Sequence, residues 1–114
     1  MVGTAMKRVI PLLQKALKIC DSINASYNSI IINQHLAEYY NDNKIMDSAK
    51  YYAYRAKEIS EEYHNDDLLK SLLLLSKIET DSIAVKYYDE YIKLNDSLVK
   101  IERNVRNKFA RIRF

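Results

Sequence analysis

The sequence predicts an all-α domain, and three observations support this. The 114 residues include one Gly and one Pro, too few for the many turns of a β protein. Apolar residues recur three and four positions apart along most of the chain, as on one face of a helix. Hydrophobic residues make up 48% of the chain, more than a disordered segment carries. A chain of this length forms one domain, 1–114, and is too short for a deep enzyme cleft with several walls.

Polar segments divide the helical pattern into successive predicted helices. The polar segments are 24–26, 41–43, 64–67 and 80–82. Between them, the predicted helices cover 8–23, 27–41, 45–63, 67–79 and 82–110. Boundaries of this kind are set by capping residues, because a short side-chain oxygen can accept a hydrogen bond from a free amide at a helix start.

In the first predicted helix, Pro11 fits the first turn, where the N–H that proline lacks has no helical partner to lose. The residues before about position 10 are therefore expected to form a lead-in. In the later helices, Asn43, Asp66, and either Asp81 or Ser82 are the candidate N-caps.

The third predicted helix carries three alanines on one stripe. Ala49, Ala53 and Ala56 follow one another at spacings of four and three, and Ala37 lies in the preceding helix. Two helices approach closely where small side chains line their contact, so we expect these helices to pair as an antiparallel hairpin. The surrounding tyrosines are expected to bury their rings at the flanks and keep their hydroxyls in water. Tyr54 is expected to point away from the stripe, toward solvent.

Short segments repeat along the chain at intervals of 35 to 40 residues, for example ALKIC at 16–20, AKEIS at 56–60 and YIKLN at 91–95. Residues 30–63 resemble a tetratricopeptide repeat (TPR), with Leu36, Ala37, Tyr40, Ala49 and Ala56 at matching positions. Two positions depart from the pattern: Asn33 stands where Trp is frequent, and Ala53 where an aromatic residue is usual. A weaker second copy has Leu75, Ser76, Glu79, Ala84, Tyr88 and Tyr91 at the corresponding positions.

The TPR resemblance implies a helical-hairpin solenoid of about two and a half repeats. The half repeat would be 8–23, the two repeats 27–63 and 67–99, and a long C-terminal helix would extend through 100–114. The family's concave groove would be lined by Gln34, Glu38 and Asn41 in the first full repeat, and by Lys70, Leu73, Lys77 and Thr80 in the second. These residues would bind a protein or peptide, although a merely solvated face has the same composition.

The C-terminal segment is strongly basic. Residues 100–114 sum to a charge of +5 and residues 1–99 to −2. Leu94, Leu98, Ile101, Val105 and Ile112 form a helical stripe with Phe109 beside it, and the bases Arg103, Arg106, Lys108, Arg111 and Arg113 lie mostly off that stripe. Three interpretations of this amphipathic helix are open: a cap packed on the last repeat, contact with an anionic membrane surface, or contact with nucleic acid. Nucleic acid ranks last because the body lacks a basic patch.

The sequence contains no pattern of a catalytic or metal site. His35 and His64 lie on different segments and lack metal-site spacing, and the one Gly excludes a Gly-rich phosphate loop. The single cysteine, Cys20, lies on an apolar helix face, which is typical of a small buried hydrophobic residue. We therefore expect a non-catalytic protein-interaction module with no cofactor and no metal.

The stretch from Tyr87 to Phe114 is similar to the segment that closes the TPR region in a class of bacterial membrane-linked regulators. This resemblance implies a piece of a longer signalling or transcription-regulating protein, on the periplasmic side of the inner membrane. Without it, a cytoplasmic location is expected, since neither a signal peptide nor a membrane-spanning run is visible. The half repeat also offers an edge for homodimerisation, formed by Ile10, Leu12, Leu13, Leu17 and Ile19.

Overall fold

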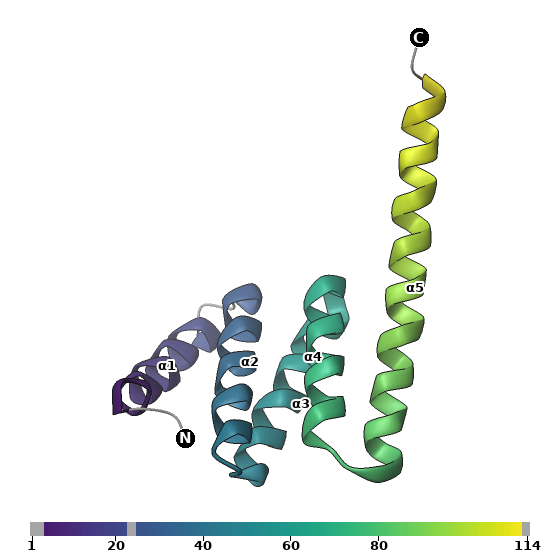
Figure 1. The fold of residues 1–114 in the computed structure, drawn as a ribbon. Helices are drawn as coiled ribbons and strands as arrows, with labels where there is room; N and C mark the ends of the chain where they lie inside the picture. The colour runs from purple at the N-terminus through teal and green to yellow at the C-terminus, as the bar shows by residue number, and fades with distance from the viewer. Residues whose placement is uncertain (1–3, 23–24, 113–114) are drawn as a thin grey trace.

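The computed structural model describes residues 4–22 and 25–112, and every regular element in these ranges is an α-helix. The five helices are α1 (Thr4–Ser22), α2 (Ser26–Asp42), α3 (Met46–Tyr63), α4 (Asn65–Ile78) and α5 (Asp81–Ile112). From α2 onward, successive helices run in opposite directions, and α1 lies inclined beside α2 (Figure 1). The predicted all-α class is confirmed. Residue 23, the predicted end of the first helix, lies outside the described residues.

The helices form an open row. The backbone of α2 lies beside those of α1, α3 and α4, the backbone of α3 also lies beside α4, and α4 lies beside α5. The radius of gyration is 17.0 Å, whereas a compact domain of this length has about 13 Å. Much of the difference comes from α5, which projects well past the other helices (Figure 1).

The core lies where α2, α3, α4 and the first half of α5 meet. Its main cluster consists of Ala37, Ala49, Ala53, Leu72, Leu74, Leu75, Ile78 and Tyr87. The alanines of the predicted stripe, together with Ala37, have no exposed surface, as the close approach of two helices requires. At the flank of this contact the rings of Tyr40 and Tyr52 are stacked, with centroids 5.7 Å apart.

The turn between α2 and α3 shows why Asn43 is not an N-cap. Asn43 ends α2 as its C-cap, and the next residue, Lys44, has a φ of 58°. The amides of Lys44 and Ile45 donate to the carbonyls of Asn41 (3.0 Å) and Tyr40 (2.9 Å). This is the hydrogen-bond pattern of a Schellman motif, whose left-handed position is usually a glycine. A lysine adopts it here, so the scarcity of glycine did not prevent a tight turn.

Asp66, the N-cap predicted for the fourth helix, is also wrong. Ile45 and His64 precede α3 and α4, and neither makes a side-chain capping hydrogen bond. Asp66 lies in the first turn of α4, and Asp81 is itself the first residue of α5. Carboxylates in a first turn still stabilise a helix through its dipole, which accounts for acidic residues at these sites.

Pro11 was expected in the first turn, but α1 begins at Thr4 and continues through Pro11. The missing amide of an interior proline leaves the carbonyl four residues earlier without its helical partner. Pro11 is exposed, so water can reach this part of the helix.

Candidate functional site

The seven residues predicted from the TPR pattern to line a groove lie on α2, on α4 or just after α4, and the backbones of these two helices are in contact. Six of the seven predicted groove residues retain access to solvent. Lys70, Lys77 and Thr80 on or after α4 are exposed, whereas Glu38, Asn41 and Leu73 are half-buried. Two helices therefore contribute polar and charged side chains with one aliphatic side chain, Leu73.

Gln34, the seventh predicted groove residue, is fully buried and cannot contact a partner. Its amide nitrogen donates to the Ser71 hydroxyl (3.0 Å) and to the Asp67 backbone carbonyl (3.1 Å). Both acceptors are on α4, so Gln34 joins α2 to α4. A residue of this kind is structural, because leaving a buried donor unpaired is costly.

A polar cluster lies where α3 meets the end of α4 and the first part of α5. The Tyr54 hydroxyl donates to the Glu79 carboxylate (2.5 Å), and the Lys50 ammonium lies 3.1 Å from the other oxygen of that carboxylate. The Tyr54 ring also packs edge-on against Tyr87, with centroids 5.8 Å apart. The expectation that Tyr54 faces solvent is therefore wrong: it is half-buried against the core.

The environment of this cluster shifts the pKa values of two of its members. The hydrogen bond from Tyr54, followed by the charge and hydrogen bond of Lys50, lowers the pKa of Glu79 below 4.5, against an opposing effect of burial. Burial, followed by the hydrogen bonds with Glu79 and Tyr87, raises the pKa of Tyr54 above 10.0. At neutral pH the carboxylate is ionised and the phenol is neutral, which suits the observed hydrogen bond.

Glu79→Gln is expected to lower the free energy of unfolding at pH 7 by about 2 kcal/mol, because the amide lacks the charge that strengthens the hydrogen bond from Tyr54 and attracts Lys50. Because the pKa of Glu79 is lower in the folded than in the unfolded protein, its ionised carboxylate stabilises the fold above the unfolded-state pKa. This stabilisation is lost as the pH falls through the folded-state pKa. The difference between wild type and variant should therefore shrink below pH 4.5, the ordinary pKa of the group. Urea unfolding at pH 7 and at acidic pH measures it, with the exposed Glu62→Gln as control. Equal stability of wild type and Glu79→Gln at pH 7 would contradict the assignment.

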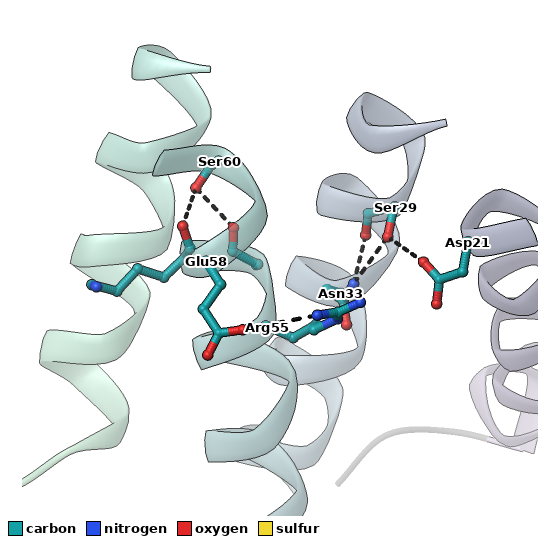
Figure 2. Close-up of polar contacts among 8 residues, drawn as sticks. Asp21, Ser29, Asn33, Arg55, Glu58 and Ser60 are labelled. Atoms are coloured by element: carbon teal, nitrogen blue, oxygen red, sulfur yellow. Dashed lines mark hydrogen bonds and ion pairs between the residues drawn. The ribbon is translucent and has the colours of Figure 1, made fainter. Parts of the chain in front are cut away.

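A second polar row runs from the end of α1 into α2. Figure 2 shows Asp21, Ser29 and Asn33 joined in sequence. The Ser29 hydroxyl donates to the Asp21 carboxylate (3.1 Å), and the Asn33 amide nitrogen donates to the Ser29 carbonyl (2.8 Å). Asn33, which occupies the frequent Trp position of the TPR pattern, is fully buried, and its side-chain oxygen has no protein partner. A cavity of about 130 Å³ lies between this row and α3, lined in part by Cys20 and Arg55.

The N-terminal edge offers less apolar surface than predicted. Ile10 is buried, and Leu13 and Leu17 are half-buried. Leu12 and Ile19 are the exposed members of this set, at 66% and 53%. The edge is therefore a narrow strip along α1.

Of the three interpretations of the C-terminal helix, a cap is found only for the first part of the stripe, where Leu94 packs against the core cluster. Residues 99–110 of α5 are all exposed, so this segment does not pack on the last helix pair. Arg103, Arg106 and Lys108 are solvated, and Arg106 lies 3.6 Å from Glu102 one turn earlier. The side chains of Arg111 and Arg113 lie outside what the structure describes.

The described residues contain neither a metal-binding cluster nor a helix that could span a membrane. No group of three or more His, Cys, Asp or Glu side chains there could hold a metal ion. Within the same residues, no helix combines the length and the apolar character needed to cross a bilayer. A scan against protein-family models, a search of curated proteins and a search of solved structures each find no match to the chain.

Proposed function

We propose that the chain is a TPR-like helical-hairpin solenoid segment that acts as a non-catalytic protein-interaction module. The burial of the pattern's aliphatic and small residues supports the solenoid: Leu36, Ala37, Ala49 and Ala56 have no exposed surface. In the second copy Leu75 is equally buried, but the aromatic position differs, because Tyr87 is buried in place of Tyr88. An open row of helix pairs, each contacting its neighbours, is the arrangement that repeat proteins use.

What supports the proposal is that α2 and α4 lie side by side and that both carry solvent-accessible polar side chains. Two exposed lysines, Lys70 and Lys77, lie on α4. The half-buried Leu73 lies between them in sequence. Such a face favours an extended segment or helix that offers acidic side chains to the lysines and an apolar side chain to Leu73. Two helix pairs make a short face, so the affinity for an isolated peptide should be modest.

We also propose, from the sequence resemblance of its C-terminal part, that the module belongs to a bacterial signalling or transcription-regulating protein. The TPR face would then report the presence of a bound protein or peptide to the rest of that protein.

A displayed random-peptide library tests the interaction face. The wild-type protein is expected to enrich peptides with acidic residues beside an apolar residue. Their affinity should fall about tenfold or more, equivalent to about 1.4 kcal/mol, in Lys70→Glu/Lys77→Glu. The matched control Arg103→Glu/Arg106→Glu reverses two exposed charges away from the face and should leave the affinity unchanged.

Circular dichroism should show that both double variants remain folded. Failure to enrich any peptide would count against the proposal. Binding that is lost in the α5 variant and retained in the α4 variant would instead favour an adaptor that acts through the basic helix.

A further inference from the structure

The last part of α5 has no neighbour within the chain as described. We call residues 99–110 the α5 extension. The nearest helix, α4, begins at Asn65, and a cavity of about 520 Å³ lined by Asp66, Asp67 and Leu98 marks where the extension leaves the body. Beyond that point α5 continues alone as a straight rod (Figure 1).

The apolar face of the extension continues the face that α4 covers. Tyr87 belongs to the core cluster, and Tyr91 and Leu94 pack against it. Steps of four and three residues lead from Leu94 through Leu98 and Ile101 to Val105, which places all of them on one side of the helix. Yet Ile101 is 56% exposed, Val105 45% and the adjacent Phe109 68%. We call the apolar stripe from Leu94 to Phe109 the seam. Its first part packs against the core cluster that includes α4, and its last part, Ile101 to Phe109, is exposed.

We propose that a second copy of this chain covers the seam, in an antiparallel pair of α5 extensions. The extension of one copy would pack against the extension of the other copy. It would lie on the same side of that α5 as α4 of the other copy, and in line with that α4. This association is separate from the α2–α4 face and does not depend on it.

The position of α4 decides the shape and direction of the occupant. Because α4 lies on the same side of α5 as the exposed seam, a flat membrane laid against the extension would collide with α4 and the body behind it. A parallel second copy would place its own α5 where α4 lies. An antiparallel helix avoids both collisions when it lies in line with α4, on the far side of Asn65.

Charge also favours a second copy. Residues 99–110 carry a net charge of +3. The region beside Leu98, which we call the foot of the extension, is acidic: Asp66 and Asp67 lie in the first turn of α4, and Glu61 and Glu62 lie in the last turn of α3. In an antiparallel pair, the basic C-terminal part of each extension, with Arg106 and Lys108, lies near the acidic residues Asp66 and Asp67 of the other copy. The C-terminal end of one α5 then also faces the N-terminal end of the other α4, an attractive arrangement of helix dipoles.

The length of the exposed seam determines how the two extensions align and how tightly the two copies bind each other. The exposed Ile101 and Phe109 are equidistant in sequence from the exposed Val105, so Val105 should lie at the twofold axis. An overlap of this length buries less than about 1,200 Å², the lower bound for standard stable interfaces. The like charges along the two extensions oppose pairing. The expected product is a reversible dimer in the micromolar range.

Sedimentation equilibrium tests the pairing. The wild type should show a monomer–dimer equilibrium, and Val105→Asp should be monomeric at high micromolar concentration. The control Asn107→Asp introduces the same charge on the opposite side of α5 and should still dimerise. Both sites are exposed, so thermal unfolding of the monomer should not change.

A wild type that stays monomeric at high micromolar concentration would overturn the proposal. So would a dimer that survives Val105→Asp and is lost in Leu12→Ser, because that result assigns association to the N-terminal edge. Binding of a monomer to vesicles containing anionic lipid, abolished by Val105→Asp, would assign the seam to a membrane and also overturn it.

Cysteine cross-linking in a Cys20→Ser background tests the direction. Val105→Cys should form a disulfide-linked dimer under mild oxidation. Ile101→Cys alone should not, whereas a mixture of Ile101→Cys and Phe109→Cys should cross-link, since these positions are equidistant from Val105. Efficient cross-linking of Ile101→Cys with itself would show a parallel pair and contradict the model.

Discussion

Ala53→Leu is expected to lower the free energy of unfolding by about 2–3 kcal/mol. Ala53 has no exposed surface and lies in the core cluster with Ala37 and Ala49, where α2 and α3 are closest. Three additional carbons at this position have no space, so the helices must separate or the new side chain must leave its preferred rotamer. Either response removes contacts along the hairpin.

Urea unfolding followed by circular dichroism measures the effect. The control is Ala110→Leu, the same substitution on the exposed α5 extension, where a change within about 0.5 kcal/mol is expected. If Ala53→Leu proved as stable as the wild type, the α2–α3 contact would have to be looser than the structure shows. The explanation of the alanine stripe would then be wrong.

Leu75→Ala is expected to cost about 2–5 kcal/mol, the range for a fully buried leucine. Leu75 has no exposed surface, and it sits in α4 within the cluster that also contains Ile78 and Tyr87. Truncation leaves a cavity between α4 and the helices packed against it, since an open row of helices has few other contacts with which to close it. Small domains have only about 5–15 kcal/mol in total, so a large fraction of the variant should be unfolded at 37 °C.

The exposed leucine of α1 supplies the control. Leu12 is 66% exposed, so Leu12→Ala should leave the free energy of unfolding nearly unchanged. Thermal melts and urea titrations of both variants decide the question. A Leu75→Ala protein that unfolds with the wild-type midpoint would place the core elsewhere than on α4.

The regular elements were predictable because they depend on local chemistry. Apolar periodicity located all five helices, and the alanine stripe identified the closest helix contact. Helix ends were less predictable, since several short polar residues compete for each cap. At the α2–α3 turn, Asn43 was expected to start a helix and instead ends one. Backbone hydrogen bonds around Lys44 decided this, and they have no side-chain signature in the sequence.

The candidate site was only partly predictable. The repeat pattern placed Glu38 and Lys77 on an accessible face, but it placed the buried Gln34 there as well. The same pattern did not reveal the hydrogen bond of Tyr54 to Glu79, because these residues are 25 positions apart in sequence, with the second half of α3 and all of α4 between them. Spacing along one helix states which residues share a face. It does not state how far the neighbouring helix lies from that face.

The amino-acid sequence by itself determined the helical class, the element order, the buried alanines and the basic character of the C-terminal segment, because each follows from periodicity or composition. Tertiary structure alone decided which polar residues are enclosed and which apolar residues remain outside. Gln34 is enclosed because α4 packs across it, and Ile101 and Val105 remain exposed because α4 begins only at the level of Leu98. The physical reason is that burial depends on the relative lengths and positions of neighbouring helices, which no single helix encodes.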